Sequence, residues 1–512
     1  MILERCRYAS SLLWDLQRRY FEGMGVDAWK LGEVPHYVTS NPTIARTYAE
    51  MVLAFRRDRI ALTGDDRSPL HICELGAGSG RFAFHFLRSL AQLCAEAGIA
   101  PTSFRYIVTD VAEANLDFLA RHPSLVPFTA AGMLDFAVFD VGQSDRLALR
   151  GGETIEAGDL GRPLVVIANY VFDGIPNDLY FVRGQQVFDC FVALSTSEDP
   201  AGLDAASLLG RLDCRFDYEQ LAEWPYADPL LNGLLDDYRR QLAESHVLFP
   251  ALGLGCLGRL SALSRQGMML LSADKGEHRL GRLDGLPPPS PVLHGSFSLS
   301  VNYHAFAAWC EKAGGVALVP HHPHRSLAVL ALLLTDRAAD HRETMRCYDR
   351  TIGGFGPDDF YTVTRQAREQ FGVMGVQEIL SHLRLARFDS HLLLHALPRL
   401  AELATDLDAD MAMQVRLAAD RAWEGYFPLG EAEDLANRIA TLLYALDDYD
   451  GALAYFDRSI AIYGADTGTL FNMALCHHMA GRHDEARPLL ERVVAHDAAN
   501  REAAAMLAQV TS

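Results

Sequence analysis

The sequence predicts an α/β fold over most of its length and an all-helical repeat region after it. Over about the first 335 residues, short apolar runs alternate with stretches of helical periodicity. This alternation is typical of a mostly parallel sheet with helices on both faces. A glycine-rich turn joins the first core strand to a helix. From about Asp336 onward no further convincing strand is evident, and a 34-residue repeat is readable near the end.

The glycine-rich turn is the centre of the predicted site. The apolar run Leu70–Leu75 ends in three glycines at alternate positions, and helical spacing follows from Phe82 to Leu93. Glycines let the backbone approach a ligand, and a helix start presents unpaired N–H groups to it. The acid before the first glycine suits a positively charged group, such as the amino group of S-adenosylmethionine (SAM), better than a pyrophosphate. A turn that only packs a helix is the alternative. The predicted SAM-binding residues of this segment are Glu74, Gly76, Ala77, Gly78, Ser79 and Gly80.

Two further strands end in acidic residues. The strand Phe104–Asp110 places Asp110 and the following Val111 where nucleotide-binding folds commonly bind ribose hydroxyls. The next strand, Leu134–Asp140, ends in Asp140, which we expect to meet the adenine amino group; Asp135 is the rival. A solvated strand end is the alternative for Asp140.

The fourth core strand carries the predicted acceptor edge. The apolar run from Pro163 reads as a parallel strand buried on both faces. Asn169, Tyr170 and Asp173 follow it, at the sheet edge where ligands bind in open α/β folds. We expect Asp173 to orient an acceptor or take its proton, and Asn169 also to contact the cofactor. A helix-capping role is the alternative for Asp173.

Composition limits the function classes. The 512 residues carry a formal net charge of -20, which disfavours nucleic acid as a substrate and favours a basic protein partner. No apolar run approaches the ~20 residues that span a bilayer, and the start lacks a signal-peptide layout. Nine scattered cysteines without a Cys-x-x-Cys pair suggest buried thiols in a reducing compartment. We therefore expect a cytoplasmic protein without a metal site, the run His321–His324 being a solvated loop.

The C-terminal repeat has a period of 34 residues. Ala440, Ala452 and Phe456 recur as Ala474, Ala486 and Leu490. This period, with small residues at the helix crossings, is the tetratricopeptide signature. Such stacks form a groove for a peptide or helix. We expect a protein substrate or partner there, with self-association as a homodimer as the alternative.

Four segments, in this order, resemble the MidA-like family of class I SAM-dependent methyltransferases, whose mitochondrial relatives assist respiratory complex I assembly and methylate a protein arginine. Val38–Pro42 is similar to the family's Thr-Ser-Pro segment near the cofactor, which implies cofactor contacts for Thr39 and Ser40. Asn169–Pro176 resembles the Asn-Glu-x-x-Asp-Ala-x-Pro motif. Ala273–Gly276 and Ser300–Tyr303 resemble the Asp-Tyr-Gly and Thr-x-x-Val-Asp-Phe segments.

The resemblance implies a class I methyltransferase with SAM as cofactor and a protein acceptor. Tyr170 stands where the family has Glu, and Asn302 where it has Asp. These two departures weaken the prediction that arginine is the methyl acceptor, because carboxylates bind guanidinium best. A SAM-binding scaffold with little activity and a small-molecule methyltransferase are the alternatives.

The expected domains follow from these patterns. They are an N-terminal helical segment over the cofactor site (1–65), the methyltransferase domain (66–335) with a helical insertion at about 196–248, and a helical repeat domain (336–512) with tetratricopeptide repeats at about 433–512.

Overall fold

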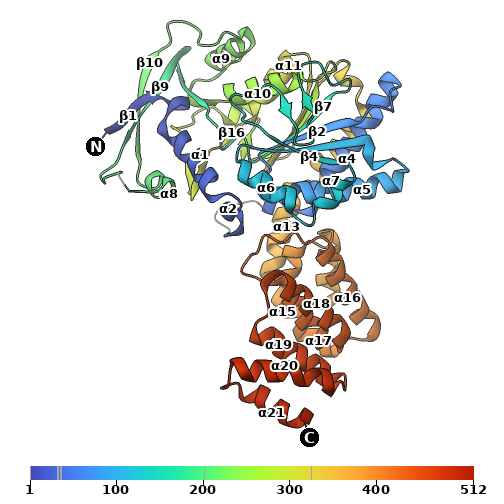
Figure 1. Ribbon diagram of the computed structural model, residues 1–512. Coiled ribbons are helices and arrows are strands. Elements are labelled where there is room, and N and C mark those ends of the chain that lie inside the picture. The colour runs from blue at the N-terminus through green and yellow to red at the C-terminus, as the bar shows by residue number, and fades with distance from the viewer. Residues whose placement is uncertain (1, 32–33, 35–36, 201, 325, 512) are drawn as a thin grey trace. The chain divides into compact units, whose positions relative to one another are not determined.

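The computed structural model describes residues 2–31, 34, 37–200, 202–324 and 326–511. The chain forms two compact units, residues 1–359 and 360–512 (Figure 1).

The first unit is built on a seven-stranded sheet. Its order is β17-β18-β12-β7-β2-β3-β4. Neighbouring strands from β12 to β4 are parallel, whereas β18 runs antiparallel to both β12 and β17. This confirms the predicted mostly parallel α/β sheet. The strands are β2 (Leu70–Leu75), β3 (Phe104–Asp110), β4 (Leu134–Val138), β7 (Leu164–Asn169), β12 (Met268–Asp274), β17 (Val316–Leu318) and β18 (Ala328–Leu334).

Helices lie on both faces of this sheet (Figure 1). The central strands β7 and β12 are buried along nearly their whole length, as strands covered on both sides must be. In this unit the helices are α1 (Leu12–Met24), α2 (Asp27–Lys30), α3 (Tyr37–Ser40), α4 (Pro42–Thr63), α5 (Arg81–Ala97), α6 (Glu113–Arg121), α7 (Val126–Ala130), α8 (Ala205–Leu209), α9 (Pro229–Gln241), α10 (Ala251–Ala262), α11 (Tyr303–Lys312) and α12 (Arg342–Tyr348).

A second, antiparallel sheet differs from what the sequence predicts. It contains β1 (Ile2–Arg7), β8 (Asp178–Arg183), β9 (Gln186–Ser195), β10 (Asp213–Gln220) and β11 (Glu244–Phe249). The predicted hairpin around Gly184 is present as β8 and β9. The insertion at 196–248 is not wholly helical, because β10 pairs along β9 and β11 pairs with β8. Likewise, the N-terminal segment begins with a strand, β1, which pairs with β9.

Shorter two-stranded pairs complete the first unit. They are β5 (Leu147–Ala148) with β6 (Thr154–Ile155), β13 (Gly276–Glu277) with β16 (Val301–Asn302), and β14 (Val292–His294) with β15 (Ser296–Ser298). β13 begins at Gly276, two residues after β12 ends at Asp274.

In the second unit the described residues form helices and no strand. Successive helices pack as antiparallel pairs, α17 with α18 and α19 with α20, over buried alanines at the predicted crossings, Ala440, Ala452, Ala474 and Ala486. The helices are α13 (Pro357–Gln370), α14 (Val376–Leu385), α15 (Ser390–Leu403), α16 (Ala409–Glu424), α17 (Leu435–Ala445), α18 (Tyr449–Tyr463), α19 (Thr467–Met479), α20 (His483–His496) and α21 (Arg501–Thr511).

Candidate functional site

The glycine turn between β2 and α5 has the backbone that its residues predict. Gly76, Gly78 and Gly80 have φ of +59°, +52° and +76°, a region that side chains other than glycine rarely adopt. A Cβ on Gly80 would lie 2.3 Å from a methyl carbon of Leu119. The turn therefore requires glycine for its conformation and, at Gly80, also for space.

The turn is bound to the end of β3 by Asp110. Oδ2 of Asp110 accepts a hydrogen bond from the Gly78 N–H (3.0 Å), and Oδ1 accepts one from the Ala112 N–H (2.9 Å). Ala77 N–H also donates to the carbonyl of Thr109 (2.9 Å). The structure thus brings the two predicted halves of a nucleotide site, the glycine turn and the strand-end acid, into direct contact. Val111, half-buried, follows at the same edge.

Glu74 lies beneath the turn as a buried acid. Its Oε2 accepts a hydrogen bond from the Tyr106 hydroxyl of β3 (2.8 Å). Burial raises the pKa of Glu74 to about 8, and the Tyr106 hydroxyl offsets only part of this. At neutral pH burial therefore favours the neutral form of Glu74.

The N-terminal segment covers the turn. Trp29 of α2 is half-buried and lies so close to Gly78 that a Cβ there would be 2.6 Å from its ring. Phe21 of α1 stacks on Trp29, with ring centroids 5.8 Å apart. Thr39 and Ser40 are buried in α3, directly before α4, whose cap Asn41 accepts the N–H groups of its first turn.

Asp140 lies outside a strand. β4 ends at Val138, because Asp140 turns the chain by accepting the Gly142 N–H (2.7 Å). Its second oxygen accepts from Arg18 of α1 (2.9 Å). A ligand group that used this oxygen would have to compete with Arg18. The predicted strand end at Asp140 is therefore wrong by two residues; its proposed contact with adenine stays a prediction.

Asn169 ends β7 with its amide in a defined orientation. Oδ1 accepts hydrogen bonds from the Tyr48 hydroxyl of α4 (3.0 Å) and from the Ala273 N–H of β12 (3.1 Å). Because the Ala273 N–H can only donate, the oxygen must face β12. Nδ2 is buried and has no partner among the described residues. Tyr48 is fully buried and was not predicted from the sequence.

Tyr170 follows with a strained backbone. Its φ is +52°, which costs a bulky residue of this kind about 1–3 kcal/mol and is frequent at functional sites. Its N–H donates to the Ala273 carbonyl (3.0 Å), so the turn after β7 is bound to β12.

Two buried acids meet behind this turn. Asp274, at the end of β12, accepts the backbone N–H groups of Asp173 (3.3 Å) and Lys275 (2.7 Å). Burial raises the pKa of Asp173 to about 7. The pKa of Asp274 is raised well above its usual range, first by burial and then by the neighbouring Asp173. A group with this pKa can hold or release a proton near neutrality; the role of Asp173 at the transfer site stays a prediction.

Asn302, the second departure from the family pattern, is a helix cap. Its Oδ1 accepts the Ala305 N–H (3.1 Å) and the Tyr238 hydroxyl (3.2 Å), and its Nδ2 donates to the Leu248 carbonyl (2.9 Å). These three hydrogen bonds give the Asn302 amide a structural role.

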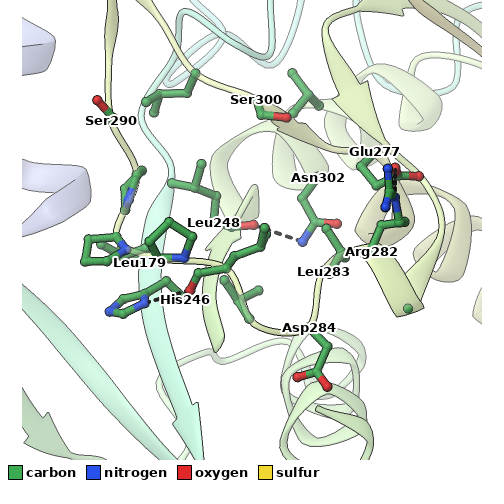
Figure 2. A pocket seen from close by; sticks show the side chains of 18 residues that line it. Leu179, His246, Leu248, Glu277, Arg282, Leu283, Asp284, Ser290, Ser300 and Asn302 are labelled. Atoms are coloured by element: carbon green, nitrogen blue, oxygen red, sulfur yellow. Dashed lines mark hydrogen bonds and ion pairs between the residues drawn. The ribbon is translucent and has the colours of Figure 1, made fainter. Parts of the chain in front are cut away.

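A cavity of about 590 Å³ lies between β11 and the 277–302 segment (Figure 2). Asn302 reaches into its wall beside Leu248 and Leu283, and Pro287, Pro288 and Pro289 line it further. Its lining is largely apolar and includes none of the predicted cofactor or acceptor residues. Within the described residues no group of three or more His, Cys, Asp or Glu side chains could hold a metal ion. Among the described residues, no helix has the length and apolar character needed to cross a membrane.

The comparisons with known proteins agree with the two units. Residues 43–274 match the family model described as "Putative S-adenosyl-L-methionine-dependent methyltransferase". Residues 431–499 match the model for tetratricopeptide repeats. The fold and the glycine turn define a SAM-dependent methyltransferase of class I architecture. Residues 43–274 thus resemble this methyltransferase family, in agreement with the resemblance seen in the sequence, and tetratricopeptide repeats follow them in the chain. No curated protein matches the sequence.

Several solved structures are similar. An uncharacterized protein from Burkholderia thailandensis has 15% identity and a TM-score of 0.38. A second protein from that organism, bound to S-adenosyl-homocysteine, has 16% identity and a TM-score of 0.40; each comparison covers 66% of this chain and 90% of the other. Magnesium protoporphyrin IX methyltransferase from Synechocystis, with bound SAM, has 10% identity and a TM-score of 0.28, covering 63% of this chain and 98% of the other.

Proposed function

We propose that this protein transfers a methyl group from SAM to a side chain of a protein that the tetratricopeptide repeats recruit. The observation that carries the proposal is the pairing, in one chain, of a SAM-dependent methyltransferase domain with repeats that bind protein segments. The cofactor lies along the glycine turn, with Asp110 and Val111 at its ribose and Glu74 near its amino group. Thr39, Ser40, Asp140 and Asn169 are the remaining cofactor residues of the proposal.

Within the second unit, the first helix of each repeat offers a surface for such a partner. Asn437, Thr441 and Tyr444 share one face of α17, since they are spaced by four and three residues. The residues 34 positions later form the same face of α19: Phe471, Leu475 and His478. All six remain at least partly exposed, whereas Ala440 and Ala474 behind them are buried.

The charge of the chain favours a basic or mixed-charge partner segment, because the net charge is -20. Binding such a segment would raise the local concentration of the acceptor near the methyl donor by orders of magnitude. We place Asn169, Tyr170 and Asp173 at the transfer site, with Asp173 orienting the acceptor or holding its proton.

The test compares labelled methyl incorporation into cell-extract proteins by the wild type and by a double variant, Thr441→Arg with Leu475→Arg. Both changes add positive charge to the proposed face. Loss of specific labelled bands at unchanged SAM binding supports recruitment. Ala461→Arg, at an exposed position of α18, is the matched control. Equal labelling of the same bands by all three proteins would refute recruitment, and no labelling despite SAM binding would favour the scaffold alternative.

A further inference from the structure

Lysine is rare in this chain, and one of its three lysines lies at the acceptor edge. Lys30 pairs with Asp27 (3.8 Å) and Lys312 with Asp237 (2.7 Å). Lys275 directly follows Asp274 at the end of β12, is exposed, and has no ion pair within the described part of the chain. An unpaired cation is thus held next to the turn that carries Asn169 and Asp173.

The backbone around Lys275 is fixed. Its N–H donates to Asp274 Oδ1 (2.7 Å), and its carbonyl accepts the Val301 N–H (2.9 Å). The parallel pairing of β12 with β7 sets Ala273 beside Asn169. The ammonium group of Lys275 therefore extends from a rigid position at the same sheet edge as the Asn169 amide.

The Asn169 amide contributes a second donor. Tyr48 and the Ala273 N–H both donate to Oδ1, so Nδ2 is the group left over. This buried N–H₂ has no partner in the described residues, and a buried unpaired donor costs about 1–3 kcal/mol until a ligand supplies an acceptor. Tyr48 acts as a positioning residue that keeps the amide in this orientation.

The two nearby acidic side chains, Asp274 and Asp173, do not fully neutralise the charge and the donors of Lys275 and Asn169. The carboxyl group of Asp274 is engaged by backbone N–H groups. With its pKa raised by burial to about 7, Asp173 is largely neutral below that pH and can itself donate a hydrogen bond. Below about pH 7 the edge therefore presents mainly hydrogen-bond donors and one full positive charge.

We propose that the methyl acceptor is a carboxylate, which Lys275 and the Nδ2 of Asn169 bind through its oxygens. This inference rests on the proposed function and names the acceptor chemistry of the same site. One carboxylate oxygen attacks the methyl carbon of SAM, a C–O bond forms, and the C–S bond breaks with its electron pair returning to sulfur. The products are a methyl ester and S-adenosylhomocysteine. The two opposite charges cancel, and no proton has to be removed.

Ester chemistry gives a direct test. Full-length protein is incubated with SAM labelled in its methyl group and a desalted cell extract, and the products are treated with mild alkali. Alkali hydrolyses methyl esters to volatile methanol, whereas N-methyl groups stay attached. We expect the label to become volatile. Label that remains non-volatile would overturn the carboxylate acceptor while leaving the methyltransferase function in place.

Variants connect the chemistry to the site. Lys275→Met should reduce labelling by about tenfold or more, since it removes a charged hydrogen bond to the acceptor. Lys312→Met removes an equal charge elsewhere and should not change labelling. Tyr48→Phe should reduce the rate by a larger factor than it reduces S-adenosylhomocysteine affinity, because the Asn169 amide that it orients contacts both acceptor and cofactor. At saturating SAM the rate should not rise from pH 6 to 8, because a carboxylate acceptor is already ionised there, and ionisation of Asp173 near pH 7 adds a negative charge that opposes its binding. Wild-type labelling by Lys275→Met, or a rate that rises through this range, would contradict the proposal.

If the extract contains no acceptor, a binding measurement tests whether Lys275 binds a carboxylate. The three lysines are labelled as ¹³C-dimethyl groups and observed by NMR in protein saturated with S-adenosylhomocysteine, with Lys275→Arg providing the assignment. Glutarate should shift the Lys275 signal and leave Lys30 and Lys312 unchanged, and guanidinium should shift none. Absence of a glutarate shift would overturn the inference. Failure of the same sample to bind S-adenosylhomocysteine would instead refute the proposed function.

Discussion

Cofactor binding should release a proton from Glu74. Burial raises the pKa of this acid from its ordinary value of 4.5 to about 8. At pH 7 a group with that pKa is about nine-tenths protonated. The ammonium group of the cofactor, which is mostly charged at pH 7, stabilises the ionised form and lowers the pKa. We therefore expect about 0.9 proton released per molecule bound at pH 7.

The sign of the pH dependence follows from the same numbers. Because the free protein must lose a proton to bind, affinity rises with pH while Glu74 is protonated. Between pH 6 and 7 the dissociation constant of S-adenosylhomocysteine should fall by nearly tenfold, and the dependence should level off near pH 8. Above that pH the ligand amine itself loses charge.

Calorimetry measures this directly. Titrations of S-adenosylhomocysteine in buffers of different ionisation enthalpy give the number of protons released. Glu74→Gln is the control, because it cannot ionise and should bind without proton release. If the wild type binds and releases no proton, then Glu74 stays neutral against Tyr106, and its proposed contact with the amino group is wrong.

Three further predictions concern single side chains. Gly80→Ala should lower the free energy of unfolding by roughly 2–5 kcal/mol in urea denaturation, because the φ of +76° is unfavourable for alanine and the added Cβ would overlap the side chain of Leu119. Asn302→Ala should cost about 1–2 kcal/mol by the same measurement, since the cap of α11 and its bond from Ala305 are lost. Tyr170→Asn should leave stability unchanged or higher, as asparagine adopts positive φ more readily, and should lower methyl transfer; unchanged transfer would remove Tyr170 from the acceptor site.

The sequence predicts the features that depend on neighbouring residues. The glycine turn, the strand ending in Asp110 and the hairpin at Gly184 each follow from a local pattern of apolar residues, glycines and acids. The 34-residue repeat is equally readable, because its buried alanines recur at fixed spacing.

Contacts between residues that lie far apart in the sequence cannot be predicted from such local patterns. Tyr48 meets Asn169 across 121 positions, and Trp29 reaches Gly78 only because α1 and α2 pack over the turn. Strand β1 needs β9 as its partner, so nothing within residues 2–7 marks it as a strand. In β10 the signal was present: Cys214, Phe216 and Tyr218 alternate with charged or polar residues, a period-two pattern that the acidic composition obscured.

The central claim is that the glycine turn binds SAM. Calorimetry of S-adenosylhomocysteine with the wild type and with Gly78→Arg tests it most directly, because an arginine there meets both a φ of +52° and the ring of Trp29. Gly23→Arg, at an exposed position with nothing within 4 Å, is the matched control. We expect binding by the wild type and by Gly23→Arg, and no binding by a folded Gly78→Arg. Equal affinity of all three proteins, or no binding by the wild type, would contradict it.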